Sequence, residues 1–73
     1  MLSFFRRVPC LRQTVIVNLT DGASAIRGVL YEVKGDWLLL KQASGLQAGQ
    51  KAIDMDGDVL VERTKVLFIQ VLS

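Results

Sequence analysis

Hydrophobic and polar residues alternate with a period of two in the segment 14–20, TVIVNLT. One side of this segment carries Val15, Val17 and Leu19, and the other carries Thr14, Ile16, Asn18 and Thr20. Because successive side chains of a strand point to opposite faces, the pattern predicts a β-strand. Asp21-Gly22 follows at once and predicts a tight hairpin turn of the type with positive φ at both central residues.

Two further strands are predicted after this turn. The segment 23–33 alternates again and carries Gly28 in its middle. A glycine inside a strand marks a bulge, a bend or a close approach of two backbones, so we expect a bend that lets one strand serve two sheets. The third strand is predicted at 37–41, and the small-residue stretch 43–50, ASGLQAGQ, is predicted as a loop.

The next part of the chain leaves two interpretations open. Residues 51–55 are either a fourth strand with its turn at Asp56-Gly57, or the first half of one long strand that bends near Gly57. Residues 59–62 continue in extended form, and a short break precedes a final strand at 66–72. The pattern as a whole predicts an all-β fold.

The predicted architecture is a small five-stranded barrel. At 73 residues the chain forms one domain. We place the barrel at 14–73 and a basic, apolar N-terminal arm, with at most a short helical turn, at 1–13.

The final strand, VLFIQVL, is apolar on both faces because only Gln70 is polar. A strand of this kind must be covered on both sides, and a small barrel has one interior. We therefore expect another copy of the chain to cover the other face or the open edge. The alternative is that the arm, with Phe4 and Phe5, covers it within one chain. The residues predicted at the subunit interface are Val59, Val61, Val66, Leu67, Phe68, Ile69 and Val71.

Charge is uneven along the chain. The first 20 residues contain three arginines and no acidic residue, whereas the rest is close to neutral. A basic arm on a neutral body suits nucleic acid, an acidic protein or a membrane surface, or it only keeps an apolar tail soluble. We favour protein partners and expect no membrane association. The residues predicted to dock a partner are Phe4, Phe5, Arg6, Arg7 and Arg12.

The inventory of reactive side chains excludes several kinds of site. There is no histidine and a single cysteine, so a Ser-His-Asp triad and a zinc or haem site cannot be assembled. Asp54, Asp56 and Asp58 are spaced like the first ligands of a calcium loop, but Lys65 stands where a glutamate is needed. We therefore expect no enzyme, no metal and no cofactor.

Targeting signals are not predicted either. Positive charges and Pro9 interrupt the apolar N-terminal run, unlike a secretion signal, so we expect a protein that is not secreted. No apolar run reaches the roughly 18 residues needed to span a bilayer.

Two aromatic residues stand near lysines. Trp37 and Tyr31 could stack on bases close to Lys34 and Lys41, which makes Lys34 and Trp37 the candidate nucleic-acid contacts. The other interpretation makes Trp37 a core plug or a subunit contact. The sequence favours this second interpretation.

The chain from residue 15 to residue 69 resembles the Sm and Sm-like (Hfq-type) family of small β-barrels. The resemblance is carried by VIVNLTDG at 15–22, GVL at 28–30, LLL at 38–40 followed by Ala43, VLVERTKV at 59–66 and LFI at 67–69. It implies a small, strongly bent, five-stranded antiparallel barrel. It also implies rings in which the fourth strand of one subunit pairs with the fifth strand of the next.

The family's RNA-site residues are replaced here. Trp37 stands at the position of the Asn that holds the base, and the Asp position falls on Lys34 or beside it. The Arg-Gly of the second motif falls on Glu62-Arg63. The resemblance therefore implies the fold without the family's usual RNA site.

The sequence is also similar to small Sm-like proteins of tailed bacteriophages. This similarity implies a non-enzymatic, ring-forming structural or assembly protein, such as a capsid, decoration or head–tail component, in the virion or the host cytoplasm. The alternative is an RNA- or DNA-binding Sm-like ring that uses the arginines of the arm together with Lys34 and Trp37.

Overall fold

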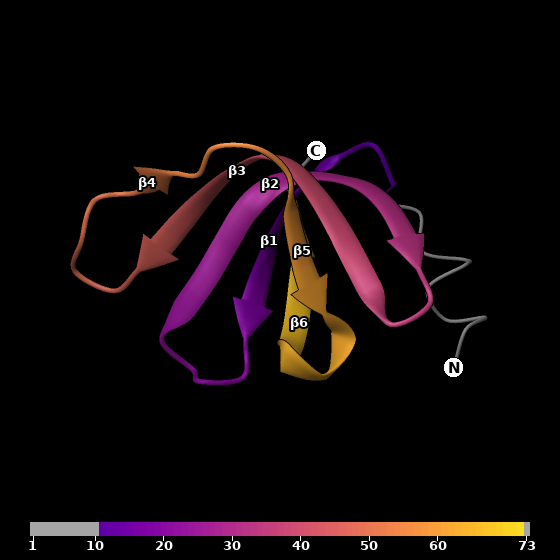
Figure 1. Cartoon of the computed structure of the whole chain (residues 1–73). Helices are drawn as coiled ribbons and strands as arrows, with labels where there is room; N and C mark the ends of the chain where they lie inside the picture. Colours follow the sequence, from indigo (N-terminus) through magenta and orange to yellow (C-terminus); the bar gives the residue numbers. More distant parts are fainter. Residues whose placement is uncertain (1–10, 73) are drawn as a thin grey trace.

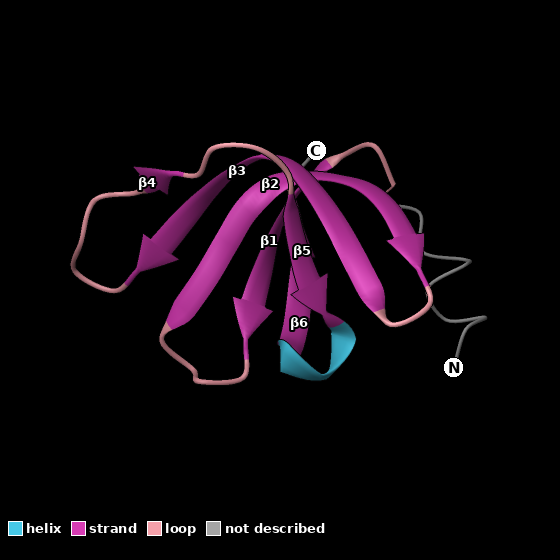
Figure 2. Ribbon diagram, in the orientation of Figure 1, coloured by secondary structure: helices cyan, strands magenta, loops and turns pink. Residues whose placement is uncertain are grey.

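The computed structural model of the chain describes residues 11–72, which form six β-strands and one short 3₁₀ helix (Figures 1 and 2). The all-β class predicted from the sequence is confirmed. The helical turn expected in the arm lies outside the described residues. The elements are β1 (Thr14–Leu19), β2 (Ser24–Lys34), β3 (Trp37–Gln47), β4 (Ile53–Asp54), β5 (Val59–Glu62), η1 (Arg63–Lys65) and β6 (Val66–Val71).

The strands form one antiparallel sheet in the order β4-β3-β2-β1-β6, and β5 pairs with β3 off this path. β4 pairs with the second half of β3, through Gly45 and Ile53, and β5 pairs with its first half, through Leu40 and Val59. These two registers differ by one residue, so β4 and β5 are two parts of one strand path interrupted around Gly57. Of the two interpretations left open, the single bent strand is correct, and five predicted strands become six elements.

β2 and β3 bend together at Gly28. A Cβ atom on Gly28 would lie 3.1 Å from the carbonyl oxygen of Lys41 and 3.3 Å from the Cα of Ala43. The register between the two strands shifts at this point, and Gln42 has a positive φ of 53°. The bend predicted at Gly28 is therefore confirmed, and the close approach of the two backbones explains why a side chain is absent there.

The prediction of a loop at 43–50 is wrong in its first half. Residues 43–47 continue β3, pairing with β2 on one side and, at Ser44 and Gly45, with β4 on the other. Small residues suggested a loop, but small residues are also what a bent strand needs where two neighbours approach closely. The connecting loop covers only 48–52.

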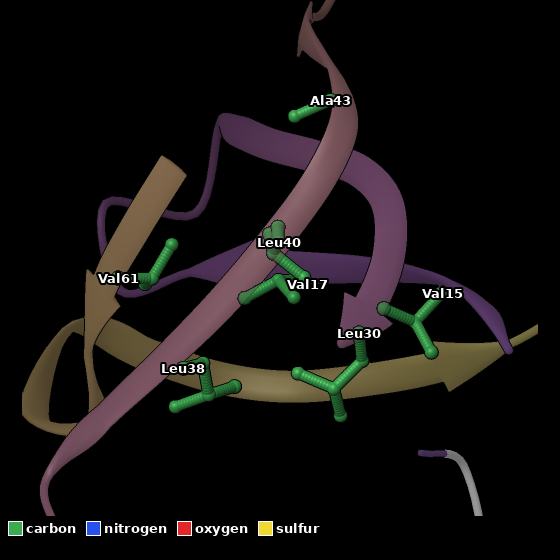
Figure 3. Packing of buried hydrophobic residues seen from close by; sticks show 7 residues of the cluster. All are labelled: Val15, Val17, Leu30, Leu38, Leu40, Ala43 and Val61. Carbon is green, nitrogen blue, oxygen red and sulfur yellow. The ribbon is translucent and has the colours of Figure 1, made fainter. Parts of the chain in front are cut away.

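The core lies inside the curl of the sheet, where buried side chains from β1, β2, β3 and β5 meet (Figure 3). Its members alternate along β1 and the first half of β3 with residues that are half-buried or exposed, as the period-two pattern predicts. No polar or charged side chain is buried within residues 11–72. The core residues are Val15, Val17, Leu30, Leu38, Leu40, Ala43 and Val61.

The turn between β1 and β2 differs from the predicted type. Gly22 has a positive φ of 75°, but Asp21 does not have a positive φ. Instead, Oδ1 of Asp21 accepts hydrogen bonds from the backbone N–H groups of Ala23 (2.9 Å) and Ser24 (2.8 Å). These two bonds, the Ala23 bond first, hold the pKa of the Asp21 carboxyl group below its ordinary value.

Replacing Gly28 should test the bend. We expect Gly28→Ala to lower the free energy of unfolding by about 1–3 kcal/mol, because an added methyl group in a close contact forces the backbones apart. Gly45→Ala is the matched control, since a Cβ there would meet nothing closer than 3.8 Å. The free energy of unfolding of this control, measured in urea, should be unchanged or should rise by up to about 1 kcal/mol. Equal losses in both variants would mean that the contact at Gly28 does not hold the bend.

The Asp21 turn should make stability depend on pH. Because the folded pKa of Asp21 is lowered, its stabilising contribution is present above the unfolded value of about 3.9 and disappears as pH falls through the folded pKa. We expect the stability advantage of the native chain over Asp21→Asn, measured by thermal unfolding, to shrink over that acidic window. An advantage that stays constant from neutral pH to the bottom of the window would contradict the assignment.

Candidate functional site

Three strands pair on one side only within residues 11–72: the two-residue β4, and the longer β5 and β6. β6 pairs with β1 on one side, and β5 pairs with β3 on one side. η1 joins these two strands, so both open edges lie at the closing point of the curled sheet (Figure 1). An unpaired edge presents a row of backbone donors and acceptors that can pair with another chain.

Hydrogen bonds at the strand ends fix which backbone groups of β6 face the open side. The N–H of Leu72 donates to the carbonyl of Thr14 at 2.9 Å, so Leu72 faces β1. Because backbone groups of an antiparallel strand alternate in direction, Ile69 and Val71 face the open side. A side-chain bond from Asn18 Nδ2 to Gln70 Oε1 (3.0 Å) fixes the β1–β6 register from the outer face.

The same argument applies to β5. The N–H of Arg63 donates to the carbonyl of Asp36 at 2.7 Å, in the register of the β3–β5 pairs. Alternation then turns the backbone groups of Leu60 and Glu62 to the open side. Each edge therefore offers backbone groups at alternate positions, as strand pairing between two chains requires.

Apolar side chains flank both edges. On β6, Leu67 and Phe68 are 58% and 52% exposed, and on β5, Leu60 is 61% exposed. Val61, which the sequence placed at the subunit interface, is a core residue instead, because its strand position points inward. Of the other residues predicted at the interface, Val71 is exposed, whereas Val59, Val66 and Ile69 are half-buried against the core.

Sequence reasoning missed a second apolar surface near β4. Ile53 and Met55 are exposed and line a groove of about 290 Å³ together with Leu19, Ile26 and Gly45. Both lie on the strand path that leads into β5. The only sequence signal was that hydrophobic residues here alternate with aspartates, which is the pattern of a strand with one apolar face.

Trp37 is not a core plug, because its side chain is 47% exposed. It lies at the start of β3, with Lys34 opposite it on β2 and Glu62 opposite it on β5. Beside it, Nε of Arg63 and Oδ1 of Asp36 form an ion pair at 3.3 Å. The two candidate nucleic-acid residues, Lys34 and Trp37, are therefore brought together, but the strand partner of Trp37 on its other side is the acidic residue Glu62.

The root of the arm is held against β2. The guanidinium of Arg12 lies 4.2 Å from the centre of the Tyr31 ring, and Nζ of Lys41 lies 4.5 Å from it. Lys41 also pairs with Asp58 at 3.6 Å. Arg12, predicted to dock a partner, is thus engaged by its own barrel, whereas Phe4, Phe5, Arg6 and Arg7 lie outside the described residues.

Neither a cluster of metal-ligating side chains nor a membrane-spanning helix is found in the part of the chain that the structure describes. No group of three or more histidine, cysteine, aspartate or glutamate side chains is placed to hold a metal ion among these residues. None of the described helical turns is long and apolar enough to cross a bilayer.

Comparison with known proteins identifies the fold. No protein-family model and no curated protein sequence matches the chain. The Sm protein of Pyrococcus abyssii, solved in complex with a uridine heptamer, has a TM-score of 0.77 and 24% identity over 97% of this chain and 96% of its own.

Chains from two crystal structures of the NatC complex are also similar. One, bound to CoA, has a TM-score of 0.74 and 30% identity over 85% of this chain and 78% of its own. The other, bound to Gag peptide and CoA, has a TM-score of 0.72 and 30% identity over 96% of this chain and 89% of its own. With the Sm protein, these matches establish that the chain has the Sm-like fold, as the sequence resemblance implied.

Proposed function

We propose that this chain is a non-enzymatic Sm-like subunit that assembles into a closed homo-oligomer, with β5 of one copy pairing with β6 of the next. The observation that carries the proposal is the pair of open edges, each with outward backbone groups and each flanked by exposed apolar side chains. Pairing of strands between chains gives affinity through main-chain hydrogen bonds, and the flanking side chains give specificity.

Because the two edges are different surfaces, their pairing favours a ring of copies over a two-fold dimer. An interface that joins one surface to a different surface repeats from copy to copy, and it ends in a ring when the rotation closes. A ring also removes both open edges, which would otherwise promote aggregation. The high hydrophobic content, 51% of residues in so small a chain, supports the same proposal.

The similar structures support an assembly role. One is an Sm protein with bound RNA, and the others are chains of a multi-component complex. Other proteins, as well as further copies of this chain, are therefore candidate partners. The narrower prediction of a bacteriophage virion component, in the virion or the host cytoplasm, rests on the sequence resemblance and stays a prediction.

Single-stranded RNA is a second candidate ligand. Trp37 is exposed beside Lys34, and stacking of a base on an aromatic side chain contributes about 1–3 kcal/mol. The Pyrococcus abyssii Sm protein, similar over nearly its whole length, binds a uridine heptamer. The local charge disfavours this candidate, since Glu62 faces Trp37 and Asp36 engages Arg63.

A proline at an outward position should block assembly. The N–H of Val71 faces the open side of β6, so Val71→Pro removes a donor that the folded subunit does not use. Native mass spectrometry should show an oligomer for the original chain and mainly monomer for Val71→Pro, with an unchanged circular dichroism spectrum.

The matched control is the neighbouring residue. The N–H of Gln70 faces β1, so Gln70→Pro removes a hydrogen bond inside the subunit and should cost about 1–3 kcal/mol of stability. If the original chain is a monomer at all concentrations, or if Val71→Pro still forms the full oligomer, the proposed pairing is wrong.

RNA binding should be tested with a uridine oligomer at two salt concentrations. If Trp37 stacks on a base, Trp37→Ala should weaken binding by about 1–3 kcal/mol. If Lys34 contacts a phosphate, Lys34→Ala should lower the slope of log affinity against log salt concentration by about one. The control is Lys51→Ala, on an exposed loop, which should leave this slope unchanged. Absence of binding at low salt, or affinity unaffected by Trp37→Ala, would exclude this candidate.

A further inference from the structure

The outer face of the sheet carries a groove, and of its lining residues only Leu60 stands beside an edge that the proposed assembly uses. It is about 380 Å³ in volume and is called here the tryptophan groove. Its apolar floor comes from neighbouring strands, because Leu39 pairs with Leu60 and Trp37 lies two residues before Leu39 on the same face. Its lining residues are Glu32, Lys34, Trp37, Leu39 and Leu60.

Two acidic residues border this groove. Glu32 lines it, and Glu62 lies opposite Trp37 on β5. Neither makes an ion pair among residues 11–72, whereas the nearby cations Lys41 and Arg63 are paired with aspartates. Lys34 is the one basic residue of the lining. The groove therefore suits an occupant that is apolar and carries positive charge.

The path of the chain leads to this groove. The N–H of Arg12 donates to the carbonyl of Leu30, and the N–H of Leu30 donates to the carbonyl of Gln13 at 3.0 Å. Nε of Arg12 donates to the carbonyl of Tyr31 at 3.2 Å, one residue before Glu32 of the lining. The chain upstream of Leu11 thus starts at the edge of the groove.

The length of the upstream segment is sufficient. Ten residues precede Leu11, and in extended form they span roughly 33–36 Å. The groove lies across three neighbouring strands spaced about 4.8 Å apart, so its width is roughly 10 Å. The upstream segment therefore reaches across it with residues to spare.

We propose that Phe4, Phe5, Arg6 and Arg7 of the same chain occupy the tryptophan groove. The two phenylalanines cover Trp37, Leu39 and Leu60, and the two arginines pair with Glu32 and Glu62. This contact involves the outer face and not the open backbone edges, so it goes beyond the proposed assembly. It also covers the ring of Trp37 and competes with any base that would stack there.

Trp37 is the sole tryptophan of the chain, so its fluorescence reports directly on the groove. In the full-length protein we expect emission of a shielded indole and weak quenching by acrylamide. The variant Phe4→Ser/Phe5→Ser should shift the emission to longer wavelength and increase quenching. The matched control, Ile53→Ser/Met55→Ser, removes two exposed apolar side chains from β4 and its exit and should leave both values unchanged.

Charge reversal gives the sharper test. Arg6→Glu/Arg7→Glu should expose Trp37 to acrylamide, and adding Glu32→Arg/Glu62→Arg should restore the shielding. Restoration supports the contact, since a general loss of folding would not be rescued. Two results would overturn the proposal. One is equal acrylamide quenching in the original chain and in Phe4→Ser/Phe5→Ser. The other is a Trp37 that stays exposed in Arg6→Glu/Arg7→Glu after Glu32→Arg/Glu62→Arg is added.

Protein concentration separates this inference from the proposed assembly. Shielding of Trp37 by its own arm does not change on dilution and persists in the Val71→Pro monomer. Shielding that disappears on dilution, in parallel with dissociation, would show that another copy covers the groove and would overturn this proposal alone. If the chain is monomeric and Trp37 is shielded, the contact between the arm and the groove is supported and only the proposed ring is overturned.

Discussion

Backbone hydrogen bonding at the ends of the sheet is the constraint on which the account of this protein depends. The sheet curls far enough to bring β5 and β6 together at η1, but each of these strands pairs on one side only within residues 11–72. Their outward N–H and C=O groups need water or another strand. Because exposed apolar side chains stand beside these groups, water is the poorer partner.

The bend at Gly28 is what creates this arrangement. β2 and β3 can cross closely because no side chain separates them, and the long strands then wrap around a core of seven buried residues. The same bend lets β3 pair with β4 at one end and with β5 at the other. A small chain thereby builds a curled sheet, while the strand that would close it belongs to a neighbouring subunit in the proposed ring.

The sequence predicted most of this fold because period-two alternation reports directly on burial. Alternation puts Val15 and Val17 on one face of the first strand and Leu38 and Leu40 on one face of the third, and all four are buried. The extent of β3 was not predictable, since small residues occur both in loops and in bent strands. The type of the Asp21 turn was also missed, because the side-chain acceptor of an aspartate competes with the backbone geometry that the Asp-Gly pair suggests.

The candidate site was predictable in part. The apolar final strand indicated an interface, but alternation could not show that Val61 belongs to the core while Leu60 is exposed. Residue-level amide hydrogen exchange at several protein concentrations tests the central claim most directly. The account predicts that the amides of Ile69, Val71, Leu60 and Glu62 exchange slowly in concentrated solution and quickly on dilution. Fast exchange of these four amides at every concentration would contradict it.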